Sequence, residues 1–168
     1  VSVDAYGYPY IVGTTNDQNL LTLNAFDSSH NGNYDGFMVK YFPNGTKMWL
    51  SYFGGTGWEE LAGISINEMN ELFLLGLTDS IDFPIKNPLN ASYSTSYTDI
   101  TSTKFVQDSD LDNMRDGWEI TNGLNPYSSE DAQIDLDGDD LSNLEEFLLG
   151  TSPNNNDTDG DEIPDNWE

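Results

Sequence analysis

Three acidic twelve-residue loops follow one another in the second half of the chain: DSDLDNMRDGWE at Asp108–Glu119 (loop 1), DLDGDDLSNLEE at Asp135–Glu146 (loop 2) and DTDGDEIPDNWE at Asp157–Glu168 (loop 3). In every loop, positions 1, 3 and 5 are Asp, position 7 is apolar, position 9 is Asp or Asn, and position 12 is Glu. The residues at these positions are Asp108, Asp110, Asp112, Met114, Asp116 and Glu119 in loop 1, Asp135, Asp137, Asp139, Leu141, Asn143 and Glu146 in loop 2, and Asp157, Asp159, Asp161, Ile163, Asp165 and Glu168 in loop 3.

This spacing suits a hard divalent cation. Ca²⁺ takes six to eight oxygen ligands at about 2.3–2.6 Å, and alternate residues of a tightly curled loop can turn their carboxylates toward one centre. Position 7 offers a backbone carbonyl, and Glu at position 12 can supply two oxygens. Without a cation, so many carboxylates held close together would repel one another. The loops therefore predict Ca²⁺ as their cofactor, bound by the residues at these six positions.

Two features separate these loops from standard EF-hands. Position 6, where the sharp turn normally uses Gly, is Asn113, Asp140 and Glu162, whereas Gly138 and Gly160 stand at position 4. Glu is a poor residue for a left-handed backbone. The segments before loops 2 and 3 also show no helical pattern, so helix–loop–helix framing is not expected. The alternative is a solvated acidic tail or a halophilic surface in which the Asp spacing is incidental.

The same segment resembles the cysteine-free thrombospondin type 3 repeats of bacterial and archaeal proteins. The resemblance covers roughly residues 108–168 and rests on the Asp runs, on DGWE at 116–119 and PDNWE at 164–168, and on Gly-x-x-Pro after loops 1 and 2, at 123–126 and 150–153. It implies a Ca²⁺-filled, string-like module with little hydrophobic core, which usually serves as a stalk or spacer in surface proteins.

Apolar residues near the loops predict small packing contacts. They recur at helical spacing through Leu141–Leu149, which predicts a helix of about two turns ended by Gly150. Trp118 and Trp167 stand at position 11 of loops 1 and 3, and Phe147 follows loop 2. We expect these aromatic residues to dock one loop on the next, with sugar stacking as the alternative for the two Trp residues.

The charge of the chain is extreme and unevenly placed. The formal net charge is −25 at pH 7, and residues 108–168 contain nineteen acidic residues and one basic residue, Arg115. This charge argues against nucleic acid and anionic membranes as partners, since both need basic patches. No run approaches the length of a membrane-spanning helix, so direct membrane insertion is not predicted. The chain has no cysteine, which excludes disulfides, thiolate metal sites and cysteine nucleophiles.

The pattern of residues 1–107 indicates β-structure. Short apolar runs at 1–4, 10–13, 37–42, 48–53, 61–66 and 72–77 are bounded by turn residues. Turns are predicted at Asp4–Gly7, at Pro43–Gly45, where Asn-Gly readily adopts positive φ, and at Asn67–Asn70.

The first half also contains an internal repeat. VSVDAYGYPYIVGTT (1–15) aligns without gaps on ISINEMNELFLLGLT (64–78), an offset of 63, and residues 35–41 match 99–105 more weakly at an offset of 64. A period of this length with four short strands is the size of a propeller blade. We therefore expect the four strands at 37–42, 48–53, 61–66 and 72–77 to form one four-stranded antiparallel sheet.

Here the chain resembles the SBBP-type β-propeller repeats. The matching segments are Asp35–Lys40, Leu50–Gly55, Ala62–Ile66, Gly76–Thr78 and Asp82–Pro84. The first unit departs from the pattern because it lacks the Asp-Phe-Pro close, and the second carries Asn70 where Gly is usual. A closed propeller needs roughly four to eight blades, so the resemblance implies further blades upstream.

The expected fold is mainly β, with two domains. Residues 1–87 would form partial propeller blades of four-stranded antiparallel sheet, one blade plus part of another. Residues 108–168 would form a loop-rich Ca²⁺-binding segment with short helices. Residues 88–107 are either a linker or the degenerate start of a further repeat.

Signals for catalysis are weak. His30 lies in a polar loop without a second histidine, and such a residue is usually solvated. Gly54–Gly57 lacks the Lys and helix of a phosphate-binding loop and is typical of a turn at a strand end. Glu59 and Glu60 are adjacent on a strand and point to opposite faces, which suits a solvated rim better than the carboxylate pair of a glycosidase. Asn-x-Ser/Thr sequences, relevant only to an exported chain, begin at Asn44, Asn90 and Asn156.

Together these features predict a calcium-binding structural or adhesive module of a larger extracellular or cell-surface protein, and not an enzyme. Calcium ions are the expected partners, with other surface proteins or glycans as further candidates. The chain opens on Val1 within a predicted strand and shows no signal peptide, so we expect a piece of a longer polypeptide. The alternatives are a non-catalytic part of a secreted enzyme, such as a glycan-degrading one, and an acidic halophilic or disordered tail without specific calcium sites.

Overall fold

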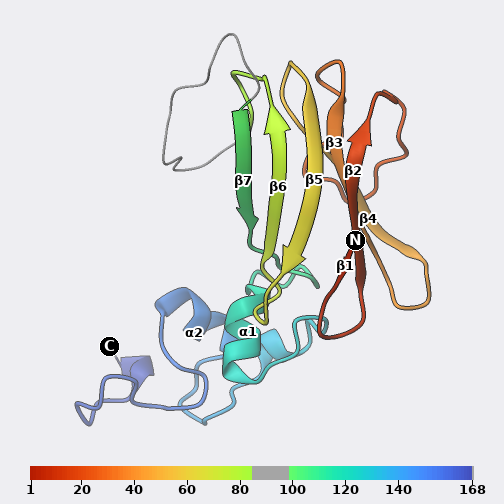
Figure 1. Ribbon diagram of the computed structural model, residues 1–168. Helices are drawn as coiled ribbons and strands as arrows, with labels where there is room; N and C mark the ends of the chain where they lie inside the picture. The colour runs from red at the N-terminus through yellow and green to blue at the C-terminus, as the bar shows by residue number, and fades with distance from the viewer. Residues whose placement is uncertain (85–98, 168) are drawn as a thin grey trace. The chain divides into compact units, whose positions relative to one another are not determined.

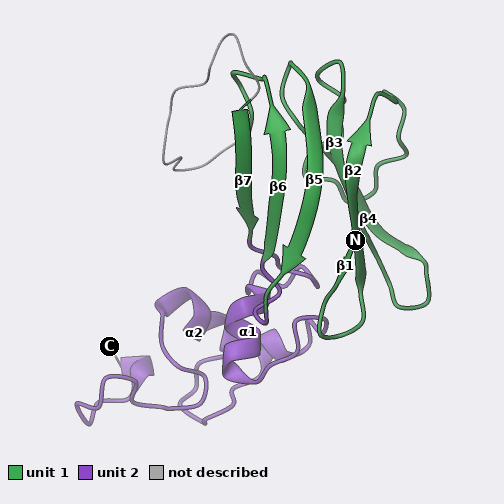
Figure 2. Ribbon diagram, viewed as in Figure 1, with its two compact units in different colours: residues 1–67, 72–105 green, residues 68–71, 106–168 purple. Residues whose placement is uncertain are grey.

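The computed structural model describes residues 1–84 and 99–167. The chain divides into two compact units (Figure 2): unit 1 comprises residues 1–67 and 72–105, and unit 2 comprises residues 68–71 and 106–168. The fold is mainly β, with two antiparallel sheets in unit 1 and a few short helices in unit 2 (Figure 1). None of the helices in the described ranges is long and apolar enough to cross a membrane.

Unit 1 consists of a four-stranded sheet and a three-stranded sheet, and neighbouring strands in each follow the chain order. Every paired strand is antiparallel to its neighbour. The first sheet contains β1 (Ser2–Val3), β2 (Pro9–Thr15), β3 (Asp35–Tyr41) and β4 (Lys47–Phe53), and the second contains β5 (Glu59–Ile66), β6 (Leu72–Thr78) and β7 (Asp99–Phe105).

The predicted hairpin turns are confirmed in the first sheet. Between β1 and β2, the Asp4 side chain accepts hydrogen bonds from the N–H groups of Tyr6 (3.0 Å) and Tyr8 (2.9 Å). Between β3 and β4, Gly45 has a φ of +84° and donates its N–H to the carbonyl of Phe42 (2.9 Å). Both turns place a short polar side chain or a Gly where the backbone reverses.

The grouping of strands into one predicted blade is wrong. The strands at 35–41 and 47–53 belong to the first sheet, and those at 59–66 and 72–78 belong to the second. Residues 54–58 carry the chain from one sheet to the other. This connection is fixed because the Gly57 carbonyl accepts a hydrogen bond from Asn33 (2.8 Å), and the Gly57 N–H donates to the Ser80 hydroxyl (2.7 Å).

The internal repeat of the sequence reappears in the strand pairing. In the first sheet Tyr10 lies opposite Lys40, and in the second Phe73 lies opposite Lys104. The other ends of the same pairs match as well, with Thr15 opposite Asp35 and Thr78 opposite Asp99. Strands β1, β2 and β3 are therefore equivalent to β5, β6 and β7. Of the segment 88–107, residues 99–105 form β7, which favours a repeat over a linker there, and residues 88–98 lie outside the described residues.

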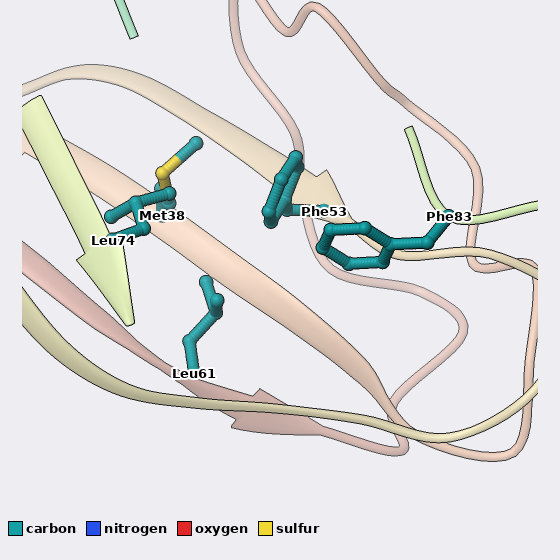
Figure 3. Close-up of a cluster of buried hydrophobic side chains, with 5 residues drawn as sticks. All are labelled: Met38, Phe53, Leu61, Leu74 and Phe83. Atoms are coloured by element: carbon teal, nitrogen blue, oxygen red, sulfur yellow. The ribbon is translucent and has the colours of Figure 1, made fainter. Parts of the chain in front are cut away.

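The hydrophobic core of unit 1 lies between the two sheets. Figure 3 shows its buried side chains, which come from β3, β4, β5, β6 and the segment after β6: Met38, Phe53, Leu61, Leu74 and Phe83. The sheets approach closely at Gly36, where an added Cβ would lie 2.7 Å from Cγ of Leu61 in β5 and also 2.7 Å from the carbonyl oxygen of Phe53 in the neighbouring strand β4. No larger residue fits there without movement of the backbone.

The helices of unit 2 begin inside the acidic loops. Three of them start at position 9 of loops 1, 2 and 3: α1 (Asp116–Asn122), α2 (Asn143–Leu149) and the 3₁₀ helix η2 (Asp165–Trp167); a second 3₁₀ helix, η1 (Asp131–Gln133), precedes loop 2. The helix predicted over 141–149 is thus confirmed as α2. It begins with a capping box of Ser142 and Glu145 and ends at Gly150, which has a φ of +88°. No α-helix leads directly into loop 2 or loop 3.

Candidate metal centres

The three loops share a backbone turn with two left-handed residues. Position 6 has a φ of 76° at Asn113, 75° at Asp140 and 75° at Glu162. Position 4 is left-handed too, with φ values of 66° at Leu111, 86° at Gly138 and 78° at Gly160. Glu162 adopts this conformation although Glu disfavours it, and its N–H donates to the Asp157 carboxylate (2.9 Å).

The Asp side chains at positions 1 and 5 accept hydrogen bonds from backbone N–H groups of their own loop and so stabilise its turn. At position 1, the two carboxylate oxygens accept hydrogen bonds from the N–H groups of positions 4 and 6. The distances are 2.7 and 3.0 Å for Asp108, 2.7 and 3.1 Å for Asp135, and 2.8 and 2.9 Å for Asp157. At position 5, the carboxylate accepts from the N–H of position 7, at 2.7, 2.8 and 2.9 Å in loops 1, 2 and 3. These oxygens have further lone pairs that a cation can use.

The carboxylates of positions 1, 3 and 5 converge in every loop. One oxygen from each lies within 4.8 Å of the others, in Asp108, Asp110 and Asp112, in Asp135, Asp137 and Asp139, and in Asp157, Asp159 and Asp161. Two oxygens on opposite sides of a Ca²⁺ ion are separated by about 4.6–5.2 Å, twice the usual Ca–O distance. A single Ca²⁺ can therefore contact all three oxygens of a loop.

The position-12 glutamates of loops 1 and 2 are fully buried. Glu119 and Glu146 each have 0% exposure. Neither oxygen of either side chain has a hydrogen-bond partner among the described residues. Buried carboxylates are normally paired or bound to a metal, because an isolated buried charge is costly. These unpartnered oxygens fit ligation of a cation better than a simple acidic surface.

The same burial disturbs proton binding. It raises the pKa of Glu119 to about 8, with the charge of Asp110 as the next cause. It also raises the pKa of Glu146 to about 7, with Asp137 next. The pKa of Asp110 is raised to about 6 by burial and by the charge of Asp112. A cation bound among these groups would favour their ionised forms and act in the opposite direction.

The Asp residues at position 9 bind the beginning of their own loop. Asp116 is fully buried and accepts hydrogen bonds from the N–H and the hydroxyl of Ser109, both at 2.7 Å. Asp165 does the same with Thr158, at 2.9 and 2.7 Å. Ser109 and Thr158 occupy position 2, and sequence analysis missed their part. The signal was present, since position 9 is Asp in the two loops that have a hydroxyl at position 2. Direct ligation by Asp116 and Asp165 stays a prediction.

In loop 2 the position-9 side chain binds a different part of the chain. Its position 2 is Leu136, and its position 9, Asn143, is fully buried. The Asn143 side-chain N–H donates to the backbone carbonyl of Asp131 (2.8 Å). Its Oδ1 has no hydrogen-bond partner among the described residues, so that this oxygen is available to a cation.

One further acid joins the site of loop 1. Asp131, in η1, places a carboxylate oxygen within 4.8 Å of one oxygen each of Asp112 and Glu119. Its position between loops 1 and 2 falls outside the twelve-residue pattern, so the pattern could not reveal it. The only hint in the sequence is that it is an acid close before loop 2.

The position-7 side chains differ in burial from loop to loop. Met114 is fully buried, Leu141 is half-buried and Ile163 is 44% exposed. Loop 3 is also the most open at its acids, since Asp159 and Asp161 are exposed. Glu168, the predicted position-12 ligand of loop 3, lies outside the described residues.

Aromatic docking is confirmed for one pair only. The rings of Trp118 and Phe147 meet edge to face, with 5.2 Å between their centroids, and join α1 to α2. Trp167 is 78% exposed, so the expectation that it docks on a neighbouring loop is wrong for the described part of the chain. The difference arises because Trp118 has the helix of the next loop beside it.

The donor set decides which metals fit. The residues that converge offer carboxylate oxygens and one amide oxygen, and the described ranges bring no thiolate or imidazole to the loops. Oxygen-only sets suit Mg²⁺, Ca²⁺ and Mn²⁺. Mg²⁺ retains several waters and is usually held by one or two carboxylates, whereas Ca²⁺ accepts six to eight oxygens in flexible geometry. Three Asp residues with a Glu beside them could hold a divalent cation that accepts several oxygen ligands.

Among the described residues, the acids of unit 1 form no comparable centre. Glu60 is exposed as predicted, but Glu59 is fully buried rather than part of a solvated rim. Its carboxylate accepts hydrogen bonds from the hydroxyls of Thr78 and Ser80 and from the Gly55 N–H, which explains why burial is tolerated.

His30 also differs from expectation. Its ring packs edge to face on Tyr52, with 5.6 Å between the centroids, and it is half-buried rather than solvated. Of the three Asn-x-Ser/Thr sites, Asn44 lies in the β3–β4 turn and Asn156 is exposed, while Asn90 lies outside the described residues.

The chain was compared with known proteins. No protein-family model matches it, and no curated protein matches it either.

Proposed function

We propose that residues 108–168 form a calcium-binding structural module, which Ca²⁺ folds and stiffens, within a larger extracellular or cell-surface protein. The observation that carries this proposal is the pair of fully buried, unpartnered carboxylates Glu119 and Glu146, each at position 12 of a loop whose three Asp residues converge. The likeness of this segment to thrombospondin type 3 repeats supports the same role.

Charge balance supports a cation rather than a protein counter-charge. Residues 108–168 contain nineteen acids, and Arg115 is their single base. Like charges a few ångströms apart repel one another even at high effective dielectric. A divalent cation in each loop removes most of this repulsion and supplies the missing partner of the buried glutamates. Binding at a free Ca²⁺ concentration a hundredfold above Kd would stabilise the folded unit by about 2.7 kcal/mol per independent site.

In this proposal unit 1 is the end of a β-propeller, and the protein is not an enzyme. The likeness to SBBP-type repeats and the equivalence of the two sheets support a propeller. Within the described residues, the two sheets do not form a closed ring. The module would carry or space the propeller, and the ligands of the propeller would be other surface proteins or glycans.

The test is a calcium titration of the full chain by calorimetry, with Trp fluorescence followed in parallel, at low and at high NaCl. Trp118 reports on loop 1 because it lies beside Glu119 and contacts Phe147. We expect saturable binding of two or more Ca²⁺ ions with a fluorescence change that persists in high salt. Weak affinities, roughly 10⁻⁴–10⁻³ M, would be typical of extracellular modules.

Two results would overturn the proposal. Absence of saturable heat would show that the loops bind no specific cation. An effect erased by NaCl would show diffuse screening of a polyanion, and the acidic-tail interpretation would replace ours. A matched titration with Mg²⁺ measures selectivity, which an oxygen site of this size should show in favour of Ca²⁺.

A further inference from the structure

Asp131 lies outside all three acidic loops, yet its carboxylate points into the site of loop 1. One of its oxygens lies within 4.8 Å of an oxygen of Asp112 and of an oxygen of Glu119, and these two oxygens also lie within 4.8 Å of each other. Asp131 follows Glu119 by twelve residues, so the contact is made by the fold and not by local sequence.

The two carboxylate oxygens of Asp131 differ in their surroundings. One accepts a hydrogen bond from the Asn125 N–H (2.9 Å), which orients the carboxyl group. The other, Oδ1, is buried without a hydrogen-bond partner in the described ranges. Beside it are the fully buried Glu119, with both oxygens unpartnered, and the buried Asp112, whose Oδ2 is unpartnered. Three carboxylates, each with a buried oxygen that has no hydrogen-bond partner among the described residues, therefore lie close together.

We propose that Asp131 is a direct ligand of the Ca²⁺ ion bound by loop 1, so that this site is completed by a residue from outside its loop. This inference rests on the function proposed above. Both oxygens of the position-9 Asp116 already accept hydrogen bonds, from Ser109 and Asn70, whereas Oδ1 of Asp131 accepts none among the described residues. Asp131 supplies the additional charged oxygen, and Glu119 and Asp112 supply the oxygens beside it.

The backbone of Asp131 is held by loop 2. Its carbonyl accepts the side-chain N–H of Asn143 (2.8 Å), and the Asn143 N–H donates to the carbonyl of Ile134 (2.8 Å). No donor in the described part of the chain pairs with Oδ1 of Asn143, so this oxygen is available to the cation of loop 2. One side chain thus links the cation of loop 2 to the residue that closes loop 1, and binding at the two loops should be positively coupled.

The variant Asp131→Asn tests this in the full chain. Asn keeps the size of the side chain and the oxygen that accepts from Asn125, and removes the charge. Glu130→Gln is the matched control, since Glu130 is the neighbouring residue and is exposed. The probe is Tb³⁺, whose emission is sensitised by Trp118 and is then displaced by Ca²⁺. Loss of the signal in Trp118→Phe identifies the part that belongs to loop 1.

We expect Asp131→Asn to weaken Ca²⁺ at loop 1 by about 10–100-fold, the loss that even outer-shell changes cause at metal sites. Glu130→Gln should stay within about twofold of the parent, as expected for an exposed charge. Excess Ca²⁺ should restore the parental end-point of the variant by mass action. Positive coupling should also appear as a smaller loss of affinity at loop 2.

Two results would overturn the inference. Equal effects of the two variants would show that Asp131 acts only through net charge. An Asp131→Asn chain that never reaches the parental end-point would show a folding role instead of ligation. In both cases Ca²⁺ binding by the parent would survive, whereas a parent that binds neither Tb³⁺ nor Ca²⁺ would remove the proposed function itself.

Discussion

At the scale of single residues, a buried carboxylate can stabilise or destabilise the fold, depending on whether a cation is bound beside it. Glu119 is enclosed among other acids and has no hydrogen-bond donor in the described part of the chain. Without metal this carboxylate costs free energy, because burial and the neighbouring charges both oppose ionisation. With metal the same carboxylate becomes a ligand. One substitution should therefore change stability in opposite directions under the two conditions.

We expect Glu119→Gln to stabilise the metal-free protein at neutral pH by about 1–3 kcal/mol, because the neutral amide avoids the free-energy cost of ionising or protonating the buried carboxyl group. In Ca²⁺ the same variant should bind about 10–100-fold more weakly and unfold at a lower temperature than the parent. Thermal unfolding followed by circular dichroism, with chelator and with Ca²⁺, measures both. A shift of the same sign under both conditions would argue against ligation by Glu119.

The raised pKa values predict how the metal-free protein responds to pH. Glu119 has a folded pKa of about 8 and Glu146 of about 7, against an ordinary value of 4.5. Between pH 4.5 and these values the folded state holds more protons than the unfolded state, so its stability should fall as pH rises. The thermal midpoint without metal should decline from pH 5 to pH 8. The double variant with Gln at both positions should flatten this slope, and a midpoint that rises with pH would contradict the assignment.

The turn of loop 1 carries avoidable strain at Leu111. This residue has a φ of 66° and is 76% exposed, so its side chain gains little from packing. A left-handed backbone costs a residue with a Cβ about 1–2 kcal/mol, and Gly adds about 0.4–1 kcal/mol of entropy to the unfolded chain. We expect Leu111→Gly to stabilise the Ca²⁺-bound protein by up to about 1 kcal/mol in urea unfolding. Gly138→Ala, at position 4 of loop 2, is the reverse change and should destabilise.

Sequence reasoning found the residues that follow the loop pattern and missed those that do not. The Asp residues at positions 1, 3 and 5 converge as predicted, because their geometry is set by a turn within one loop. Asp131 could not be found in this way, since it reaches loop 1 only after the chain has folded back. Glu59 was misjudged for a similar reason: its partners Thr78 and Ser80 come from the far end of the neighbouring strand.

At the scale of elements, the positions of the strands followed from the sequence but their grouping did not. Alternation and turn residues are local, and they place strands within a few residues of those observed. Pairing between sheets depends on contacts far apart in the chain. Here the chain passes from the first sheet to the second in residues 54–58, where hydrogen bonds to Asn33 and Ser80 hold the connection in place. A period of 63 residues cannot show where within that period one sheet ends.

The close approach of the sheets at Gly36 predicts a sharp difference between two glycines. A Cβ on Gly36 would meet Leu61 and the backbone oxygen of Phe53 at 2.7 Å, whereas a Cβ on Gly63 would meet nothing nearer than 4.0 Å. Gly36→Ala should therefore destabilise unit 1 by about 1–3 kcal/mol, as overpacking of a core does. Gly63→Ala should be close to neutral. Urea unfolding in Ca²⁺ measures both, and equal effects would show that the structure around Gly36 can adjust at little cost.

At the scale of the whole molecule, the two units are stabilised by different forces. Unit 1 has a hydrophobic core between two sheets, whereas unit 2 contains the acidic loops and few buried apolar side chains. Calcium should act on the second only. We expect calorimetric unfolding to show two transitions, of which only one moves to higher temperature with rising Ca²⁺. A single transition that moves as a whole would show that the units unfold together.

The repeated strand register governs how a chain of this kind can lengthen in evolution. Strands β2 and β6 are related by 63 residues and β3 and β7 by 64, and the one-residue difference falls in the connection between them. A duplicated or deleted gene segment that encodes one such period returns every strand to an equivalent partner. A segment that shifted one strand of a pair by a single residue would turn its inward side chains outward. Viable length variants should therefore be spaced by about one period, with their small insertions confined to the connections.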